Sequence, residues 1–360
     1  MRRALPAVAF FGGFLWDAIT LGRSVGSMDL WILAGYLALA AGILWFLGRR
    51  EALAANARLA SETSVVPTAL PMTETETLPW WRESGPYLLL QFCFGGLFSA
   101  LFIFYFKSSS HFLALVWALG LAGLLVANEF LESRYRRFTL TWALFGLCAM
   151  LLLNFVVPHV VGSIASIWFY LSTLAGAGLA HGLRLKTPGR PGRIKPVWGI
   201  AAGLMLAYMV DAIPPVPLVT QDIAVGHALV KAEGEYRLQH EKTPWWLFWR
   251  DIESEIHLAL GERLYCLAAI FAPSGLNTRL VHHWRFHDPK EGWVTRSRIG
   301  FNLAGGRKDG YRGYTYKQNL QPGEWSVAVE TENGRTVTLH RFTISDEPLA
   351  ADAAMLTRAM

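Results

Sequence analysis

The stretch YLLLQFCFGGLFSALFIFYF, residues Tyr87–Phe106, decides the architecture of this chain. It runs for twenty residues without a charged side chain, and an α-helix needs about that length to cross the hydrocarbon core of a bilayer. Similar apolar runs recur on both sides of it. They cover Ala4–Leu21, Leu30–Leu47, Ser110–Asn128, Thr139–Val157, Ile164–Ala180 and Val197–Pro217. The pattern predicts a polytopic α-helical membrane domain of about seven transmembrane helices in residues 1–218.

The two outermost runs differ from the others because each contains an aspartate. Ala4–Leu21 follows two arginines, as the apolar part of a signal peptide does. It contains Asp17 and has no small-x-small cleavage site, so we expect a helix that is retained. Val197–Pro217 ends in Asp211 and three prolines, so it is the weakest of the predicted spans.

Lysine and arginine alternate between the connecting segments. The N-terminus and the second, fourth and sixth connections hold fourteen of them, whereas the first, third and fifth hold two. Basic connections stay on the cytoplasmic side of a membrane. The N-terminus is therefore expected to be cytoplasmic, and seven crossings place the C-terminal part on the other side.

Two kinds of residue within the apolar runs attract attention. Asp17 and Asp211 are ionisable groups at or near membrane depth, where charge is costly, so both are candidate intramembrane functional residues. Contact with headgroups or a hydrogen bond between helices is the alternative role for each. Glycines four residues apart predict close helix packing, unless the spacing arises by chance. These pairs are Gly178 with Gly182, and Gly199 with Gly203.

The composition changes after residue 218. Charged residues make up 17% of the whole chain, against about 25% in soluble proteins, and the deficit lies in residues 1–218. The net charge of +6 comes from loops between apolar runs, so we expect no nucleic-acid partner. Residues 219–254 read as a connector with interfacial aromatic residues, which lie on the membrane surface or cap the next domain. Those aromatics are Trp245, Trp246, Phe248 and Trp249.

Residues 255–346 show short runs in which apolar residues alternate with others, which is typical of β-strands. Leu280, His282, Trp284 and Phe286 form one such face, opposite His283 and His287. Asn333-Gly334 predicts a type I′ hairpin turn. The pattern predicts an all-β antiparallel sandwich, followed by a flexible tail in residues 347–360.

The order of motifs in this part resembles a known family. They are Arg263-Leu264-Tyr265-Cys266, Ala272-Pro273-Ser274-Gly275-Leu276, His282-His283-Trp284, Gly305-Gly306-Arg307, Gly310-Tyr311-Arg312 and Gly323-Glu324-Trp325. Residues 255–346 are similar to domain-of-unknown-function family 2914, and residues 1–218 resemble the uncharacterised proteobacterial membrane family 5924. Both resemblances imply a protein of the bacterial inner (plasma) membrane, multi-pass, with a periplasmic C-terminal domain. Neither implies an activity.

The glycine-rich motif holds the candidate ligand-binding residues. Gly305 and Gly306 let backbone approach a ligand closely, while Arg307, Tyr311 and Arg312 offer groups that bind a carboxylate, a phosphate or a sugar. The alternative is a tight strand connection with arginines in ion pairs. We expect no metal and no cofactor, because a cation, Arg285, separates His283 from His287 and no third ligand is evident.

Three functions remain open at this stage. No nucleophile–base pair stands in a recognisable setting, so the favoured interpretation is non-enzymatic: a periplasmic binding or interaction module on a membrane anchor, serving envelope maintenance or sensing. Its expected partners are membrane lipids and an envelope glycan, lipid or protein. The first alternative is an envelope enzyme acting on a lipid-linked or glycan substrate, with Asp211, His111 or His159 as acid or base. The second is a transporter.

Overall fold

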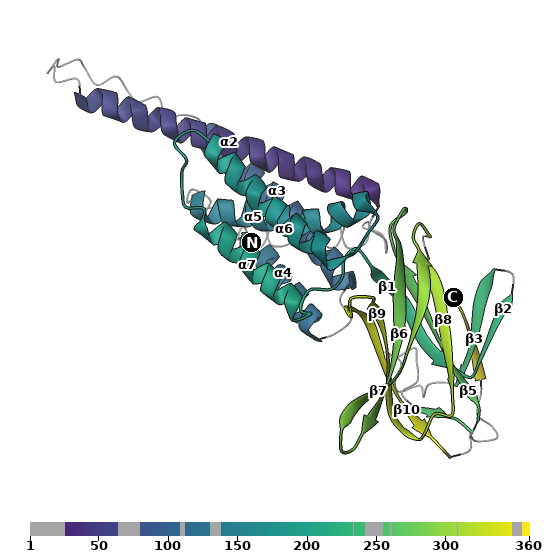
Figure 1. Ribbon diagram of the computed structural model, residues 1–360. Coiled ribbons are helices and arrows are strands. Elements are labelled where there is room, and N and C mark those ends of the chain that lie inside the picture. Colours follow the sequence, from purple (N-terminus) through teal and green to yellow (C-terminus); the bar gives the residue numbers. More distant parts are fainter. Residues whose placement is uncertain are drawn as a thin grey trace, which may run out of the picture.

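A computed structural model gives the structure of the chain and describes residues 26–63, 80–108, 112–129, 138–232, 234–241, 255–259, 261–307, 309–347 and 355–360. These residues form a helical part and then a strand-rich part, which lies against one end of the helices (Figure 1). The predicted helix Ala4–Leu21 with Asp17 lies outside the described residues. So do His111 and the aromatic residues of segment 242–254.

The described residues contain six α-helices, so the expected seven are not supported. They are α2 (Ser27–Thr63), α3 (Trp80–Ser108), α4 (Phe112–Glu129), α5 (Phe138–Val161), α6 (Ser166–Lys186) and α7 (Lys195–Met209). Three of them are long and apolar enough to cross a membrane, at Met28–Ala60, Gly85–Ser108 and Phe138–Val161. The last predicted span, Val197–Pro217, is cut short because α7 ends at Met209 and prolines follow.

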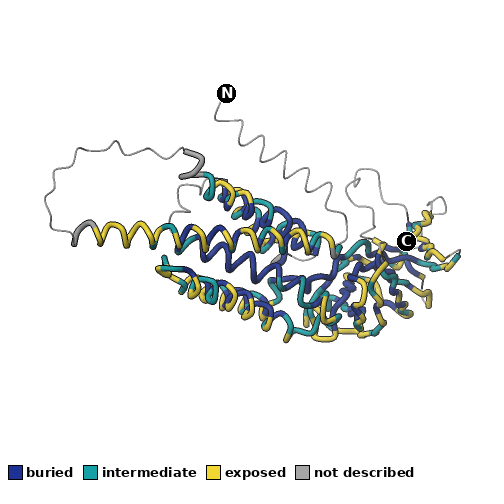
Figure 2. The backbone as a smooth tube through the Cα atoms, turned by 90° about the horizontal axis from the view of Figure 1, so that it is seen from above, coloured by how far each residue is buried: buried dark blue, intermediate teal, exposed yellow. Residues whose placement is uncertain are grey.

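Helix α5 runs through the middle of the helical part. It packs against α2, α3, α6 and α7, and Trp142, Phe145 and Phe155 on it are almost completely buried. Its sequence is apolar on every side, as expected of a helix that is surrounded by others. Figure 2 shows buried residues along the inner faces of the helices and exposed ones on the outside.

Polar side chains of the described helices form hydrogen bonds from one helix to the next. The Gln91 side chain donates to the Asn128 carbonyl and the Asn128 side chain to the Gln91 carbonyl, each at 3.2 Å, which joins α3 to α4. Asn154 accepts from Ser172 and so joins α5 to α6. In an apolar surrounding such hydrogen bonds hold helices together.

The glycine pairs predicted to bring helices together do not do so. A Cβ placed on Gly178, Gly182, Gly199 or Gly203 would meet no atom within 4 Å among the described residues. The close approaches occur elsewhere: Gly176 lies against the backbone of Met150, and Gly146 against Val197. These glycines lie on helix faces that point away from the other described helices.

The basic α6–α7 connection lies at the end of the helical part that is far from the strands. Arg184 donates to the Arg190 carbonyl at 2.8 Å in the α6–α7 connection, and Trp142 at the start of α5 donates to Pro191. The opposite ends of α5, α6 and α7 face the strands. The described helices α5, α6 and α7 therefore alternate in direction.

The strand-rich part has eleven strands in its described residues. They are β1 (Val219–Gly226), β2 (Ala228–Ala232), β3 (Glu235–Glu241), β4 (Glu255–His257), β5 (Arg263–Phe271), β6 (Asn277–Asp288), β7 (Gly292–Ala304), β8 (Tyr311–Gln318), β9 (Gly323–Thr331), β10 (Thr336–Ser345) and β11 (Met355–Ala359). They form three sheets, ordered β1-β5-β8, β4-β10-β9-β6-β7 and β11-β3-β2.

The first two sheets pack face to face around one apolar core, as predicted for a β-sandwich. Leu280, Trp284 and Phe286 of β6 lie buried in it against Cys266 and Ile270 of β5. The alternation read from the sequence marks these inward faces correctly. One strand departs from the antiparallel prediction, since β4 pairs with β10 in parallel.

Parts of the predicted connector and of the predicted tail form strands that pair in the sheets. Strands β1, β2 and β3 come from residues 219–254, and β1 pairs with β5 along its length. Strand β11, from residues 347–360, pairs with β3. Strand β3 has only Leu238 and Glu241 buried, so its sequence carries few of the apolar residues that indicate a strand.

The β9–β10 turn is also different from the prediction. Only Gly334 has a positive φ there, at 77°, so the turn is not type I′. Gly334 donates to the Thr331 carbonyl at 2.9 Å, and Thr331 donates to the Arg335 carbonyl. This is the pattern of a longer hairpin loop that ends in a left-handed glycine.

Candidate binding groove beside the helices

The two glycines of the predicted site hold two strand connections together. The N–H of Gly305 donates to the Leu276 carbonyl at 2.8 Å, and the N–H of Gly306 donates to the Ala272 carbonyl at 3.0 Å. A Cβ on Gly305 would collide with the Pro273 carbonyl oxygen. Gly306 has a φ of 101°, which favours glycine. These contacts of Gly305 and Gly306 pack the β7–β8 connection against the β5–β6 connection.

The structure brings two of the three predicted side chains together. The exposed guanidinium of Arg307 lies 5.9 Å from the centre of the Tyr311 ring. Tyr311 packs against the sandwich core, so Arg312, the next residue along β8, points to the opposite face of its sheet. Arg312 is therefore separate from the pair formed by Arg307 and Tyr311.

Tyr311 lines a groove that the sequence did not reveal. The groove has a volume of about 460 Å³ and is lined by Asn277, Thr278, Arg279, Asn302, Leu303, Ala304 and Tyr311. Arg279 lies opposite Asn302 in the β6–β7 pair. A Cβ on Gly300 would lie 2.5 Å from the Arg279 Nε, so the glycine leaves the room in which this guanidinium lies.

The groove lies at the end of the β-sandwich that faces the helices. It begins at Asn277, two residues after Gly275, whose carbonyl lies against Gly162 at the end of α5. Ile164, just before α6, packs against the sandwich core. In Figure 1 the β6–β7 turn lies at the far end of these strands, away from the helices.

Asp211, the second intramembrane candidate, lies at the junction of the two parts. It follows α7 with a φ of 57°, and its carboxylate lies 3.5 Å from Arg335 on the β9–β10 hairpin. Arg335 also donates to the Tyr208 carbonyl and lies 4.0 Å from the centre of that ring. These contacts give Asp211 a role in fixing the sandwich to the helices.

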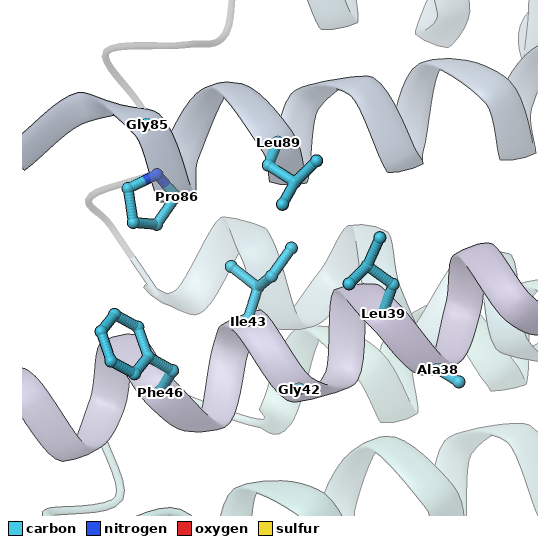
Figure 3. Close-up of a pocket in the computed structure, with 8 residues that line it drawn as sticks. All are labelled: Ala38, Leu39, Gly42, Ile43, Phe46, Gly85, Pro86 and Leu89. Carbon is cyan, nitrogen blue, oxygen red and sulfur yellow. The ribbon is translucent and has the colours of Figure 1, made fainter. Parts of the chain in front are cut away.

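The helices themselves carry an apolar groove of about 430 Å³ between α2 and α3. Figure 3 shows Pro86 and Leu89 of α3 pointing toward Ile43 and Phe46 of α2. The residues that line it present carbon and no charge, so this groove offers no site for an ion or a polar ligand.

A buried carboxylate joins the ends of segment 242–254. Glu241 binds the Nε2 of His227 at 2.9 Å and the Nδ1 of His257 at 2.8 Å. Burial raises the pKa of Glu241, but the hydrogen bonds from His227 and His257 outweigh burial, and the pKa lies below its ordinary value. Sequence reasoning missed this cluster, since its members come from three separate segments.

The family comparison agrees with the C-terminal resemblance. Residues 277–344, from the start of β6 to near the end of β10, match the family described as protein of unknown function (DUF2914). The groove residues Asn277, Arg279, Asn302 and Tyr311 all lie inside this match. The resemblance of residues 1–218 to family 5924 stays a prediction. No curated protein matches the chain.

Solved structures give weak likenesses. A β-glucosidase from Listeria innocua in complex with glucose is 11% identical over 32% of this chain and 17% of its own, with a TM-score of 0.22. An immunoglobulin-like protein from Pseudomonas aeruginosa is 11% identical over 34% of this chain and 97% of its own, with a TM-score of 0.21. The chain thus spans 17% of the β-glucosidase. At such scores neither likeness carries an argument.

Proposed function

We propose that this chain is a multi-pass protein of the bacterial inner membrane whose β-sandwich is a periplasmic binding module. Three helices with apolar spans of membrane length support the anchor. The basic connections at the far end of the helices support a cytoplasmic N-terminus and a periplasmic sandwich. The fixed junction at Asp211 and Arg335 then holds the module against the membrane surface.

We propose that the groove at Arg279 binds the anionic headgroup of a membrane lipid. The observation that carries this proposal is the position of the groove, at the end of the sandwich that rests on the helices. A guanidinium is suited to a phosphate, which it binds through two parallel hydrogen bonds. The amides of Asn277 and Asn302 and the Tyr311 ring supply hydrogen bonds and a flat face for the hydroxyl-bearing part of a headgroup.

Retention of lipid by the purified full-length protein tests this proposal. The protein is mixed in detergent with equal amounts of phosphatidylglycerol and phosphatidylcholine, and native mass spectrometry counts the lipids that stay bound. Wild type is expected to retain phosphatidylglycerol preferentially, and Arg279→Ala to lose about one bound phosphatidylglycerol. Arg263→Ala, an exposed arginine outside the groove, is the matched control. Equal retention by Arg279→Ala and Arg263→Ala would refute the assignment, whatever lipid the basic helix ends retain.

A further inference from the structure

Three side chains on the outer face of the five-stranded sheet form a continuous hydrogen-bonded row. The Nδ1 of His283 on β6 lies 2.7 Å from the Glu330 carboxylate on β9. The Nε2 of the same ring lies 2.8 Å from the Thr295 hydroxyl on β7. An acid, an imidazole and a hydroxyl are thus joined in the order that acyl-transfer enzymes use.

The Glu330 carboxylate determines which atoms donate and which accept in this row of hydrogen bonds. A carboxylate only accepts hydrogen bonds, so the Nδ1 of His283 carries a proton, and in the neutral imidazole the Nε2 lone pair accepts from the Thr295 hydroxyl. Glu330 is buried, and Arg298 holds its second oxygen at 3.1 Å. His283 is 8% exposed and Thr295 is exposed, so the hydroxyl is the member of the row that a solute can reach.

A bulge in the β6–β7 pairing determines which residue lies opposite Thr295. The register shifts between Trp284 and Arg285, so that Arg285 lies opposite Thr295. The Nε of Arg285 is buried and has no hydrogen-bond partner among the described residues, and the same holds for the hydroxyl of its other neighbour, Ser326. A buried donor without a partner is uncommon and calls for an explanation. Arg285 therefore places a positive charge beside an exposed hydroxyl, where it can stabilise a developing negative charge.

We propose that Thr295, His283 and Glu330 form a hydrolytic site for carboxylic esters that carry an anionic group. Thr295 is the nucleophile and His283 the general base, while Glu330 holds the imidazole in place. Arg298 is a positioning residue, because it acts through Glu330. The preference for anionic substrates rests on Arg285, Arg298 and Arg341, which side-chain alternation places on this one sheet face.

The reaction needs only the ester and water. The Thr295 oxygen attacks the carbonyl carbon while its proton passes to the Nε2 of His283, and the oxyanion forms beside Arg285. The ester C–O bond breaks, and His283 gives the proton to the leaving alkoxide, which departs as an alcohol. Water then attacks the threonyl ester and its proton moves to His283. The carboxylic acid leaves, and the proton returns to Thr295.

Hydrolysis of model esters by the full-length protein in detergent tests the site. p-Nitrophenyl hemisuccinate is the anionic probe and p-nitrophenyl acetate the neutral one. Wild type is expected to hydrolyse the hemisuccinate with the higher kcat/KM. Thr295→Ala is expected to lower kcat/KM by about 100-fold or more. Thr343→Ala, an exposed threonine on β10 of the same sheet, should leave the rate unchanged.

Two further measurements separate a catalytic row from a merely structural one. Thr295→Ser keeps the hydroxyl, so it should restore most of the activity that Thr295→Ala loses, at the same melting temperature. A β-lactone probe should leave an acyl adduct on Thr295, located by peptide mass spectrometry, and none in the Glu330→Gln or His283→Gln variants. Wild-type rates equal to those of buffer with both esters would overturn the proposal. An unchanged rate in Thr295→Ala, or an adduct on another residue, would do the same.

Discussion

The guanidinium of Arg335 lies between the carboxylate of Asp211 and the aromatic face of Tyr208. It is 3.5 Å from the first and 4.0 Å from the centre of the second. Arg335 belongs to the β9–β10 hairpin, whereas the other two residues close α7. One side chain of the sandwich therefore makes an ion pair and a cation–π contact with a helix end, and the side chain of Arg335 is only 14% exposed there.

Removing this guanidinium should loosen the junction and leave both parts folded. Arg335→Ala is expected to cost about 1–3 kcal/mol, since it removes a partly buried ion pair and a cation–π contact. Hydrogen exchange of the full-length protein should become faster in the β9–β10 hairpin and at the end of α7. Arg341→Ala, an exposed arginine on β10, is the control. Unchanged exchange in Arg335→Ala would show that the junction depends on other contacts.

A reporter that is active only outside the cytoplasm tests the orientation. Fused after Met360 it should be active, and inserted at residues 187–192, between α6 and α7, it should be silent, because that connection is basic. The two positions lie at opposite ends of the described helices. The reverse result would place the sandwich in the cytoplasm and refute the proposed membrane position of the groove.

The folded boundary of the sandwich is expected at residue 219. A fragment of residues 219–360 keeps β1, which pairs with β5 and covers its edge, so it should be soluble and rich in β-structure by circular dichroism. A fragment of residues 255–346 lacks β1 and leaves β5 as an uncovered edge strand, which favours aggregation. It should be insoluble or much less stable. Equal stability of the two fragments would contradict the importance of β1.

His282 should make the sandwich sensitive to acid. Burial lowers the pKa of His282 to about 3, from an ordinary 6.5. Between these values the unfolded chain binds a proton that the folded chain does not, so stability falls as the pH falls, by up to about 1.4 kcal/mol per pH unit. His282→Gln can keep the hydrogen bond to Thr315 without titrating, and should flatten this dependence. His287→Gln, at a half-exposed position, should not.

In the glycine-rich connection, substitution of Gly305 should destabilise the protein, whereas substitution of Arg307 should not. Gly305→Ala places a methyl group against the Pro273 carbonyl, and we expect a loss on the order of 2 kcal/mol in the free energy of unfolding. Arg307 is exposed and lies over Tyr311, so Arg307→Ala should shift the melting temperature of the full-length protein by less than about 2 °C. A large loss in Arg307→Ala would show that this guanidinium has a structural role.

Much of the sandwich could be predicted from side-chain alternation. Leu280, His282, Trp284 and Phe286 stand at every second position, and burial of one sheet face imposes that period. Strand β3 was not predicted, because Glu235–Glu241 is polar and is held by pairing with β2 and β11 rather than by burial. The prediction of a type I′ turn at Asn333-Gly334 was wrong, because this dipeptide also fits a longer loop in which only Gly334 is left-handed.

The sites were harder to predict, for a physical reason. The Gly305–Tyr311 segment was found because its residue types are unusual and close in sequence, and Tyr311 does line a groove. Its partners Arg279 and Asn302 come from two other strands. The row of Glu330, His283 and Thr295 depends on the register of three strands and on one bulge. The alternation of side chains along a strand shows which face of the sheet each residue lies on. It does not show which residues of other strands lie beside it.

Helix α2 has 37 residues, and at 1.5 Å per residue it is about 55 Å long. A bilayer with a hydrocarbon core of about 30 Å cannot contain such a rod, so the portion after Arg49 would stand in the aqueous phase on the side away from the sandwich. The described helix is continuous through this portion and holds no proline. It would act as a lever: the portion after Arg49 is about 20 Å long, so a tilt of about 10° at the membrane would carry the end of the helix sideways by about 4 Å.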